Sequence, residues 1–240
     1  MAATVERDME KLPINRSQKI RLVSIVIPVF NERKMIETKI GRVQNVEIPK
    51  ELIIVDDGST DGTREWLLNR FGQGSTDEEK SQKEFGESRA DCSRVRVLTH
   101  QHNQGKGAAL KTGFLHARGS IVIVQDADLE YSPENYHRLM ALVITGCTDV
   151  VYGSRFLGVW KGNWPLVSSL GNKIFTALTN AATGLSLTDV WTGYKVFKQE
   201  VLEDISLEES GFELELELTL KGGSEELACD VGADFLFAQK

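Results

Sequence analysis

The 240-residue chain has few cysteines, no surplus of positive charge and no long hydrophobic run. Its three cysteines, Cys92, Cys147 and Cys229, are odd in number and lack metal-ligand spacing, which argues against a disulfide framework and a thiolate metal site. We expect reduced thiols in a cytoplasmic protein. The formal net charge of −7 argues against nucleic acid as a partner, although a local basic pocket for phosphate remains compatible with it.

No segment approaches the ~18–20 apolar residues that a membrane-spanning helix needs. The nearest candidate, Trp164–Thr183, is interrupted by Asn172, Lys173 and Asn180. It is either a core helix or an amphipathic helix that rests on lipid headgroups. Residues 1–21 are polar and charged, so we expect a flexible N-terminal segment and not a signal peptide.

Strand-like and helix-like segments alternate through the first two-thirds of the chain, which predicts an α/β fold with a mainly parallel sheet between helices. The expected strands are Val23–Val29, Leu52–Val55, Val95–Leu98, Ile121–Val124 and Val150–Tyr152, and the expected helices are Lys34–Val46, Thr63–Phe71, Ala108–Ala117 and Pro133–Thr145. Residues 72–94 are mostly polar and predict a mobile surface insertion. Phe212–Leu218 alternates with period two, which favours a strand, although Glu and Leu are good helix formers.

The segment Asp126-Ala127-Asp128 directly follows one of the expected buried strands. Two carboxylates at the carboxyl end of a parallel strand lie where open α/β sheets bind ligands. Hard oxygen ligands without a neighbouring His or Cys suit Mg²⁺ or Mn²⁺, which usually bind together with phosphates. The alternative is a polar turn, because Asp is a common turn residue.

Three further polar segments follow expected strands, namely Pro28–Glu32, Asp56–Thr63 and Asn103–Gly107. An acidic pair at a strand end can accept hydrogen bonds from a base or a ribose. Glycines beside Lys106 at a helix start would favour an anion. Each segment alone could be an ordinary loop, but one sheet edge would bring all of them together.

With these motifs in view, the chain resembles the family 2 glycosyltransferases of GT-A fold, most closely the dolichyl- or polyprenyl-phosphate mannosyl- and glucosyltransferases. The resemblance covers residues 22–221 as one GT-A domain, followed by an atypical or truncated tail at 222–240. It rests on seven motifs that occur in the family's order: Pro28–Glu32, Asp56–Thr63, Asn103–Gly107, Asp126–Pro133, Gly153-Ser154-Arg155, Asn163-Trp164-Pro165 and Asp189–Lys195. In the family Phe212–Lys221 lies on a helix, so we expect a helix there.

The resemblance implies a role for each matching residue. Positions that hold the base and ribose are matched by Pro28, Phe30, Glu32, Val55 and Asp57; Lys106 and Ala127 complete the expected donor site. Asp126 and Asp128 match the pair that bridges Mg²⁺ or Mn²⁺ to the diphosphate, with Glu130 as a third ligand. Arg155 matches an arginine that contacts the acceptor phosphate, Asp189 would orient Arg155 or a lysine or else cap a turn, and Lys195 or Lys198 would meet a phosphate.

The implied reaction is transfer of mannose or glucose from GDP-mannose or UDP-glucose to a polyprenyl or dolichyl phosphate, with inversion, at the cytoplasmic face of a membrane. Two other functions remain open, namely transfer to a sugar or protein hydroxyl and nucleotide-sugar binding without catalysis. Ser168 stands where the family carries a second arginine, with Lys173 close by as a substitute, and residues 222–240 lack the family's basic loop. These departures weaken the basic half of the expected site.

Overall fold

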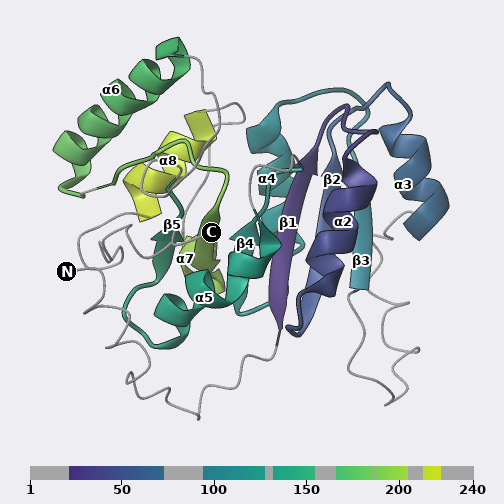
Figure 1. The fold of residues 1–240 in the computed structure, drawn as a ribbon, viewed down its shortest axis with the longest axis horizontal. Helices are drawn as coiled ribbons and strands as arrows, with labels where there is room; N and C mark the ends of the chain where they lie inside the picture. The colour runs from purple at the N-terminus through teal and green to yellow at the C-terminus, as the bar shows by residue number, and fades with distance from the viewer. Residues whose placement is uncertain are drawn as a thin grey trace.

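The computed structural model describes residues 22–72, 94–127, 132–154, 166–185, 187–204 and 213–222. Helices and strands alternate along these ranges (Figure 1). In chain order they are β1 Val23–Val29, α2 Ile36–Asn45, β2 Lys50–Asp56, α3 Thr63–Phe71, β3 Arg94–Thr99, α4 Lys106–Leu115, β4 Ile121–Val124, the 3₁₀ turn η1 Pro133–Asn135, α5 Tyr136–Ile144, β5 Val150–Tyr152, α6 Leu166–Thr183, β6 Lys195–Lys198, α7 Gln199–Asp204 and α8 Glu213–Gly222.

The described strands form one six-stranded sheet in the order β3-β2-β1-β4-β6-β5. β1 pairs in parallel with β2 on one side and with β4 on the other, and β3 continues the parallel set beyond β2. β6 runs antiparallel to both of its neighbours, β4 and β5. The sheet is therefore mainly parallel, as the alternating pattern predicts.

Two hydrophobic layers cover the two faces of the sheet. Alternate residues of β1 serve both, with Ile25 and Ile27 in the layer under α2, α3 and α5, and Val26 in the layer under α4, α7 and α8. A strand buried on both faces is mostly apolar, which is why β1 and β4 are rich in Val and Ile. Gly113 lets α4 approach β1 closely, because a Cβ there would lie 2.3 Å from Cγ1 of Val26.

Most expected elements occur with shifted ends. β1, β4, β5 and α3 have the expected bounds, whereas β2 and β3 extend beyond the predicted apolar runs. The helical assignment of the alternating Glu-Leu segment is confirmed by α8. Strand β6 was not predicted, because its sequence Lys-Val-Phe-Lys is short and has a charge at each end. Three expected segments lie outside the described residues: the N-terminal segment 1–21, residues 73–93 of the expected insertion, and the tail from residue 223 to residue 240.

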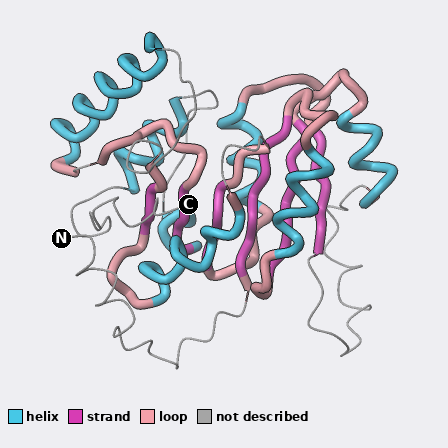
Figure 2. The backbone as a smooth tube through the Cα atoms, viewed as in Figure 1, coloured by secondary structure: helices cyan, strands magenta, loops and turns pink. Residues whose placement is uncertain are grey.

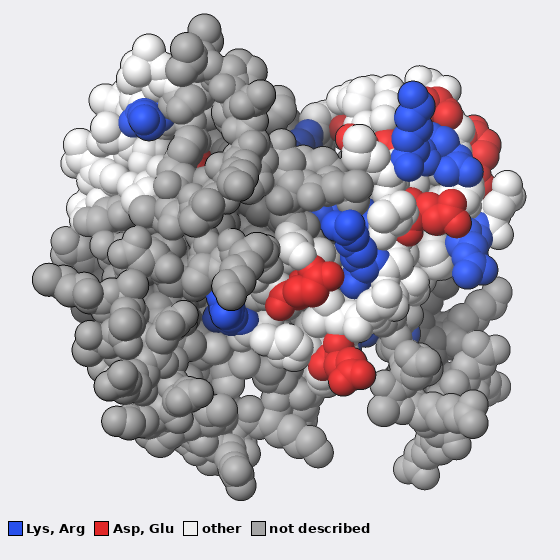
Figure 3. Space-filling view, viewed as in Figure 1, with Lys and Arg blue, Asp and Glu red and all other residues white. Residues whose placement is uncertain are grey.

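Helix α6 packs beside α8 (Figure 1). Several of its polar side chains are buried, and several of its apolar side chains are exposed. Its buried positions include Asn172, Thr176 and Thr179, while Leu170 and Leu178 are each 61% exposed. Figure 3 shows mostly uncharged atoms over this helix. No helix within the described ranges is long and apolar enough to cross a bilayer. Helix α6 therefore carries apolar side chains on its exposed face.

The carboxyl ends of the parallel strands meet at one edge of the sheet, where Figure 2 shows loops crowded above β1, β2 and β3. Sheet order reverses between β1 and β4, because the chain proceeds outward from β1 through β2 and β3 before it returns to β4. Such a reversal opens a crevice between the loops, which is the usual ligand site of open α/β sheets.

Candidate functional site

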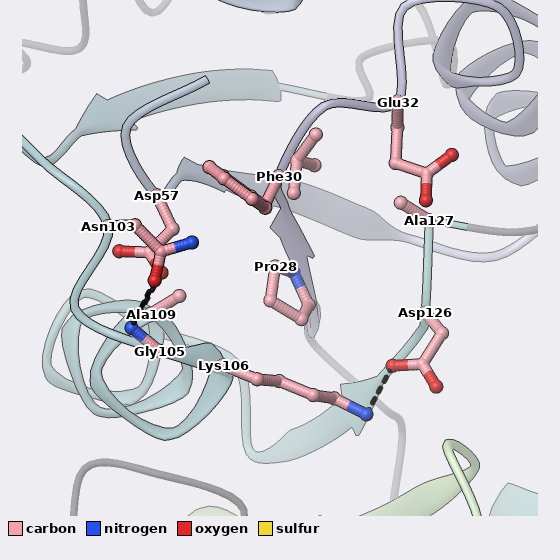
Figure 4. Close-up of a pocket in the computed structure, with 11 residues that line it drawn as sticks. Pro28, Phe30, Glu32, Asp57, Asn103, Gly105, Lys106, Ala109, Asp126 and Ala127 are labelled. Carbon is pink, nitrogen blue, oxygen red and sulfur yellow. Dashed lines mark hydrogen bonds and ion pairs between the residues drawn. The ribbon is translucent and has the colours of Figure 1, made fainter. Parts of the chain in front are cut away.

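A pocket of ≈ 400 Å³ lies at this reversal point (Figure 4). The end of β1, the loops after β1, β2, β3 and β4, and the start of α4 line it. The lining residues are Pro28, Val29, Phe30, Glu32, Asp57, Asn103, Gly105, Lys106, Ala109, Asp126 and Ala127. Segments far apart in the chain thus converge, as the strand-end argument predicts. Of the side chains assigned to the donor site from the sequence, Val55 does not line the pocket, since it is fully buried in the core layer beneath α4.

Asp57 is held at one end of the pocket by a set of hydrogen bonds. The backbone amide of Gln104 donates to Oδ1 at 3.0 Å and that of Gly105 donates to Oδ2 at 2.8 Å. Nδ1 of His100 lies 2.7 Å from the same Oδ1, and its Nε2 lies 2.9 Å from the Thr112 hydroxyl. The carboxylate is therefore fixed in orientation, with little exposure of its own.

Further hydrogen bonds connect the loop after β1 to the loop after β2. The Asn31 amide donates to Ser59 Oγ at 2.9 Å, and Asn31 Oδ1 accepts from the Thr60 amide at 2.8 Å. Asp61 accepts from the Arg33 amide at 3.1 Å and from the Thr63 amide at 3.0 Å. Desolvation opposes the ionisation of Asp61, but the Thr63 hydroxyl and these amides outweigh it and lower the pKa of Asp61 below its ordinary value.

Lys106 and Asp126 form an ion pair at the other end of the pocket, with Nζ 2.8 Å from Oδ1 (Figure 4). Lys106 is the first residue of α4, and its side chain extends from the helix start across the pocket to Asp126 (Figure 4). This end of the pocket combines a cation and an acidic oxygen donor. The ammonium stabilises an anion, and the carboxylate suits a metal ion.

Hydrogen bonds from buried polar side chains hold the backbone at Asp126 in place. Nε2 of Gln125 donates to the carbonyl of Asp126 at 3.0 Å, and the hydroxyl of Tyr136 donates to Oε1 of Gln125 at 2.9 Å. Burial, with a smaller contribution from the nearby charge of Glu134, raises the pKa of Tyr136 well above its ordinary value. Tyr136 therefore stays protonated and remains a donor at neutral pH.

The expected metal site is described only at its first member. Asp126 faces the pocket, whereas Asp128 and Glu130 lie outside the described residues. Within the part of the chain that the structure describes, no group of three or more His, Cys, Asp or Glu side chains could hold a metal ion. The carboxylate of Asp126 fits a hard divalent ion, and the roles of Asp128 and Glu130 stay predictions.

Of the residues expected around the acceptor, those that the structure describes do not line the pocket, although the register of β6 brings Lys195 to the end of β4. Buried Asp189 accepts a hydrogen bond from Nδ2 of Asn172 on α6 at 2.6 Å, and the Thr188 hydroxyl donates to Oγ of Ser154 at 2.6 Å. Lys195, also buried, begins β6 level with the end of β4, and its Nζ donates to the Thr192 carbonyl at 2.5 Å. Arg155 lies outside the described residues, as does the side chain of Ser168; Lys173 is exposed on α6.

The structure does not bring Lys198 to the pocket. It ends β6 opposite Ile121, at the far edge of the sheet, and its ammonium pairs with Asp149. The prediction that Lys198 would meet a phosphate in the site is therefore not supported, because antiparallel β6 carries its last residue away from the pocket. Sequence reasoning also missed His100 and Thr112, although a histidine two residues after an expected strand was a signal that could have been used.

The mainly parallel sheet and its likeness to a solved structure of GT-A fold confirm the expected fold class, and the family model that matches this chain is that of a glycosyltransferase. The model of glycosyl transferase family 2 matches residues 24–206, and the chain belongs to that family.

Two curated relatives and one solved structure illustrate the similarity. Polyprenol monophosphomannose synthase of Mycolicibacterium smegmatis is 31% identical over 202 residues, covering 81% of this chain and 69% of that one. Dolichol-phosphate mannosyltransferase of Pyrococcus furiosus is 29% identical over 205 residues, covering 83% of this chain and 53% of that one. The present chain therefore spans only about half the length of the P. furiosus protein. Glucosyl-3-phosphoglycerate synthase of Mycobacterium tuberculosis, solved with Mn²⁺, UDP-glucose and phosphoglyceric acid, is 21% identical with a TM-score of 0.60, covering 85% of this chain and 65% of that one.

Proposed function

We propose that the protein transfers a hexose, mannose or glucose, from a nucleotide-diphosphate sugar to a polyprenyl or dolichyl phosphate, with inversion at the anomeric carbon. One observation carries the proposal: the pocket has an oriented carboxylate at one end and the Lys106–Asp126 ion pair at the other. The acceptor class is supported by the names of the curated relatives, which include mannosyltransferases of polyprenol, dolichol and undecaprenyl phosphate.

The Asp57 end suits the nucleoside. Its carboxylate accepts N–H or O–H donors of a base or a ribose, and Pro28 and Phe30 offer apolar surface between the two ends of the pocket (Figure 4). Phe30 is 44% exposed, so a base can pack on its ring without displacing other side chains. Such contacts bind the nucleotide without selecting between GDP-mannose and UDP-glucose.

The Lys106 end suits the diphosphate. Breaking the bond between the sugar and the nucleotide leaves negative charge on the departing diphosphate, and the ammonium of Lys106 stabilises it. Asp126, together with Asp128 and Glu130, would hold Mg²⁺ or Mn²⁺, which supplies further charge neutralisation. The Mn²⁺ in the solved M. tuberculosis synthase supports a divalent ion in a site of this fold.

A phosphate acceptor makes a general base unnecessary. A phosphate monoester is largely ionised at neutral pH, with a second pKa of ~6, so its oxygen attacks the anomeric carbon without first losing a proton. The bond to the diphosphate oxygen breaks on the opposite face, and the nucleoside diphosphate leaves with the electron pair. The residue that we assign to aligning the acceptor is Arg155, because a guanidinium binds phosphate through two parallel hydrogen bonds.

A membrane surface is the partner that the outward face of α6 fits. Leu170, Ile174 and Leu178 are 61%, 52% and 61% exposed, and Lys173 is the one charged residue in the α6 sequence. A helix with an exposed apolar face and little charge gains free energy by lying in the interface of a bilayer. A polyprenyl phosphate is anchored in that bilayer, so contact there would bring its headgroup toward the sheet edge.

The reaction is tested with polyprenyl phosphate, radiolabelled GDP-mannose or UDP-glucose, and Mg²⁺ or Mn²⁺, followed by extraction into organic solvent. We expect label in the lipid fraction and its loss by about a hundredfold or more in Asp126→Asn, since the variant removes a carboxylate that would hold the divalent ion against the diphosphate. Circular dichroism of the variant checks that the fold is retained. Label that remains in a water-soluble product would favour a hydroxyl acceptor, and donor binding without any transfer would indicate a non-catalytic binder.

Membrane contact is tested by sedimentation with vesicles of a neutral phospholipid. The variant Leu170→Ser/Leu178→Ser should lose most vesicle binding while its melting temperature stays close to the wild-type value, because both side chains are exposed. The matched control is Leu115→Ser on α4, where the leucine is 84% exposed on another helix. Equal losses in the two variants would argue against a specific role for α6.

A further inference from the structure

The imidazole of His100 bridges the pocket carboxylate and helix α4. Its Nδ1 lies 2.7 Å from Oδ1 of Asp57 and its Nε2 lies 2.9 Å from the hydroxyl of Thr112. The side chains of His100 and Asp57 are only 10% and 4% exposed. In the neutral ring Thr112 donates to Nε2, which places the ring proton on Nδ1, and in the charged ring both nitrogens carry protons. In either form His100 donates to Asp57.

Donors from the chain fill most of the hydrogen-bonding capacity of Asp57. A carboxylate has about four acceptor positions. Oδ1 receives His100 and the Gln104 amide, and Oδ2 receives the Gly105 amide. Oδ2 thus retains capacity for one more donor. Because Oδ1 is held on two sides, the carboxylate cannot turn freely about its bond to Cβ.

The backbone of His100 is anchored without help from its ring. Its amide donates to the Asp56 carbonyl at 2.9 Å, and its own carbonyl accepts a hydrogen bond from the guanidinium of Arg64. The two amides that bind Asp57 belong to the adjacent loop and also stay in place. Removing the imidazole therefore changes the freedom of the Asp57 carboxylate more than the path of the chain.

We propose that His100, itself supported by Thr112, is a positioning residue that pre-orients Asp57 for a donor group of the nucleoside in the pocket. The inference rests on the proposed function in that it takes the pocket to bind a nucleoside diphosphate. Pre-orientation lowers the entropic cost of binding, so loss of His100 weakens nucleotide affinity and leaves later steps of the reaction largely unaffected.

The test compares two amide replacements of the histidine in the full chain. In His100→Asn the side-chain amide lies near the position of Nδ1 and still donates to Asp57, whereas in His100→Gln the amide reaches toward Thr112 and leaves Oδ1 without this donor. Titration calorimetry with UDP and with GDP, each with Mg²⁺, gives the dissociation constants, and thermal unfolding gives the melting temperature.

We expect His100→Gln to weaken binding of the preferred nucleotide about tenfold and His100→Asn to stay within about threefold of wild type, at similar melting temperatures. Thr112→Val, which keeps the His100–Asp57 contact, should weaken binding about threefold, and it provides the comparison if a histidine variant does not fold. Wild-type affinity in both His100→Gln and Thr112→Val would overturn the role of His100 alone. A wild-type chain that binds neither nucleotide would instead refute the proposed function together with this role.

Discussion

The glycines at positions 58 and 62 offer a matched test of how tightly the pocket loops pack. Both residues have left-handed backbone torsions, with φ of 81° at Gly58 and 92° at Gly62. An added Cβ at Gly62 would meet nothing within 4 Å, whereas at Gly58 it would lie 2.5 Å from the backbone nitrogen of Asn103. Alanine therefore brings conformational strain at both positions and a backbone clash at only one.

The conformational strain and the backbone clash contribute separately to the cost of each substitution. Left-handed backbone costs an L-residue roughly 1–2 kcal/mol, and this cost is shared by Gly62→Ala and Gly58→Ala. The entropy that alanine removes from the unfolded chain is also shared, so it cancels in the comparison. Overpacking adds roughly 1–3 kcal/mol at Gly58, because the loop that carries Asn103 is held to Asp57 by two amide hydrogen bonds and cannot move without breaking them.

Thermal unfolding of the two variants measures the difference. A gap of about 2 kcal/mol corresponds to a melting temperature ~4–8 °C lower for Gly58→Ala than for Gly62→Ala in a chain of this size. Nucleotide affinity should fall only in Gly58→Ala, since the displaced loop also carries Gly105 and Lys106. Equal melting temperatures would show that the loop after β3 yields freely and would refute this account of a rigid pocket.

Three further predictions concern charged groups. Lys106→Met should strengthen binding of Mn²⁺ alone, measured by electron paramagnetic resonance, because Asp126 loses its competing cation, and should weaken binding of a nucleoside diphosphate; weaker Mn²⁺ binding would contradict the ion-pair argument. Asp61→Asn should flatten the acid side of the stability–pH profile, because the pKa of Asp61 is lower in the folded state than in the unfolded chain. The ionised carboxylate stabilises the folded state above the unfolded-state pKa of about 3.9, and this contribution is lost as the pH falls through both pKa values. An unchanged profile in urea unfolding at several pH values would exclude Asp61 as a contributor. Arg64→Met should cost about 2–4 kcal/mol in urea unfolding, because it leaves the buried Asp56 without its ion-pair partner at 2.8 Å, and Asp56→Asn in the same chain should recover part of that loss.

The parallel half of the fold was predictable because each signal was local. Val23–Val29 is apolar apart from Ser24 because both of its faces are buried, so its bounds could be predicted from composition. Asp57 and Asp126 lie directly after such runs, which was enough to place them at one edge of the sheet. Here the sequence patterns and the structure agree.

The antiparallel strand β6 could not be predicted from local sequence patterns in the same way. Lys195 and Lys198 are separated by three positions in the chain, yet the direction of β6 puts the first at the pocket edge and the second at the opposite edge. Nothing in a four-residue segment specifies its direction, since that depends on pairing with β4 and β5. The contact between His100 and Asp57 was missed for a related reason, because it joins residues that follow different strands.

The central position of β6 between β4 and β5 has a consequence for synthesis on the ribosome. Strands β1, β2 and β3 come from consecutive segments of the chain, so they can pair as soon as they emerge. Among the described strands β5 pairs only with β6, and β4 has β6 as its second neighbour. Until residue 198 has left the ribosome, β5 and one edge of β4 therefore lack these partners, and such edges are where nascent chains associate wrongly. The half of the sheet beyond β1 is thus the half that we expect to depend on chaperones.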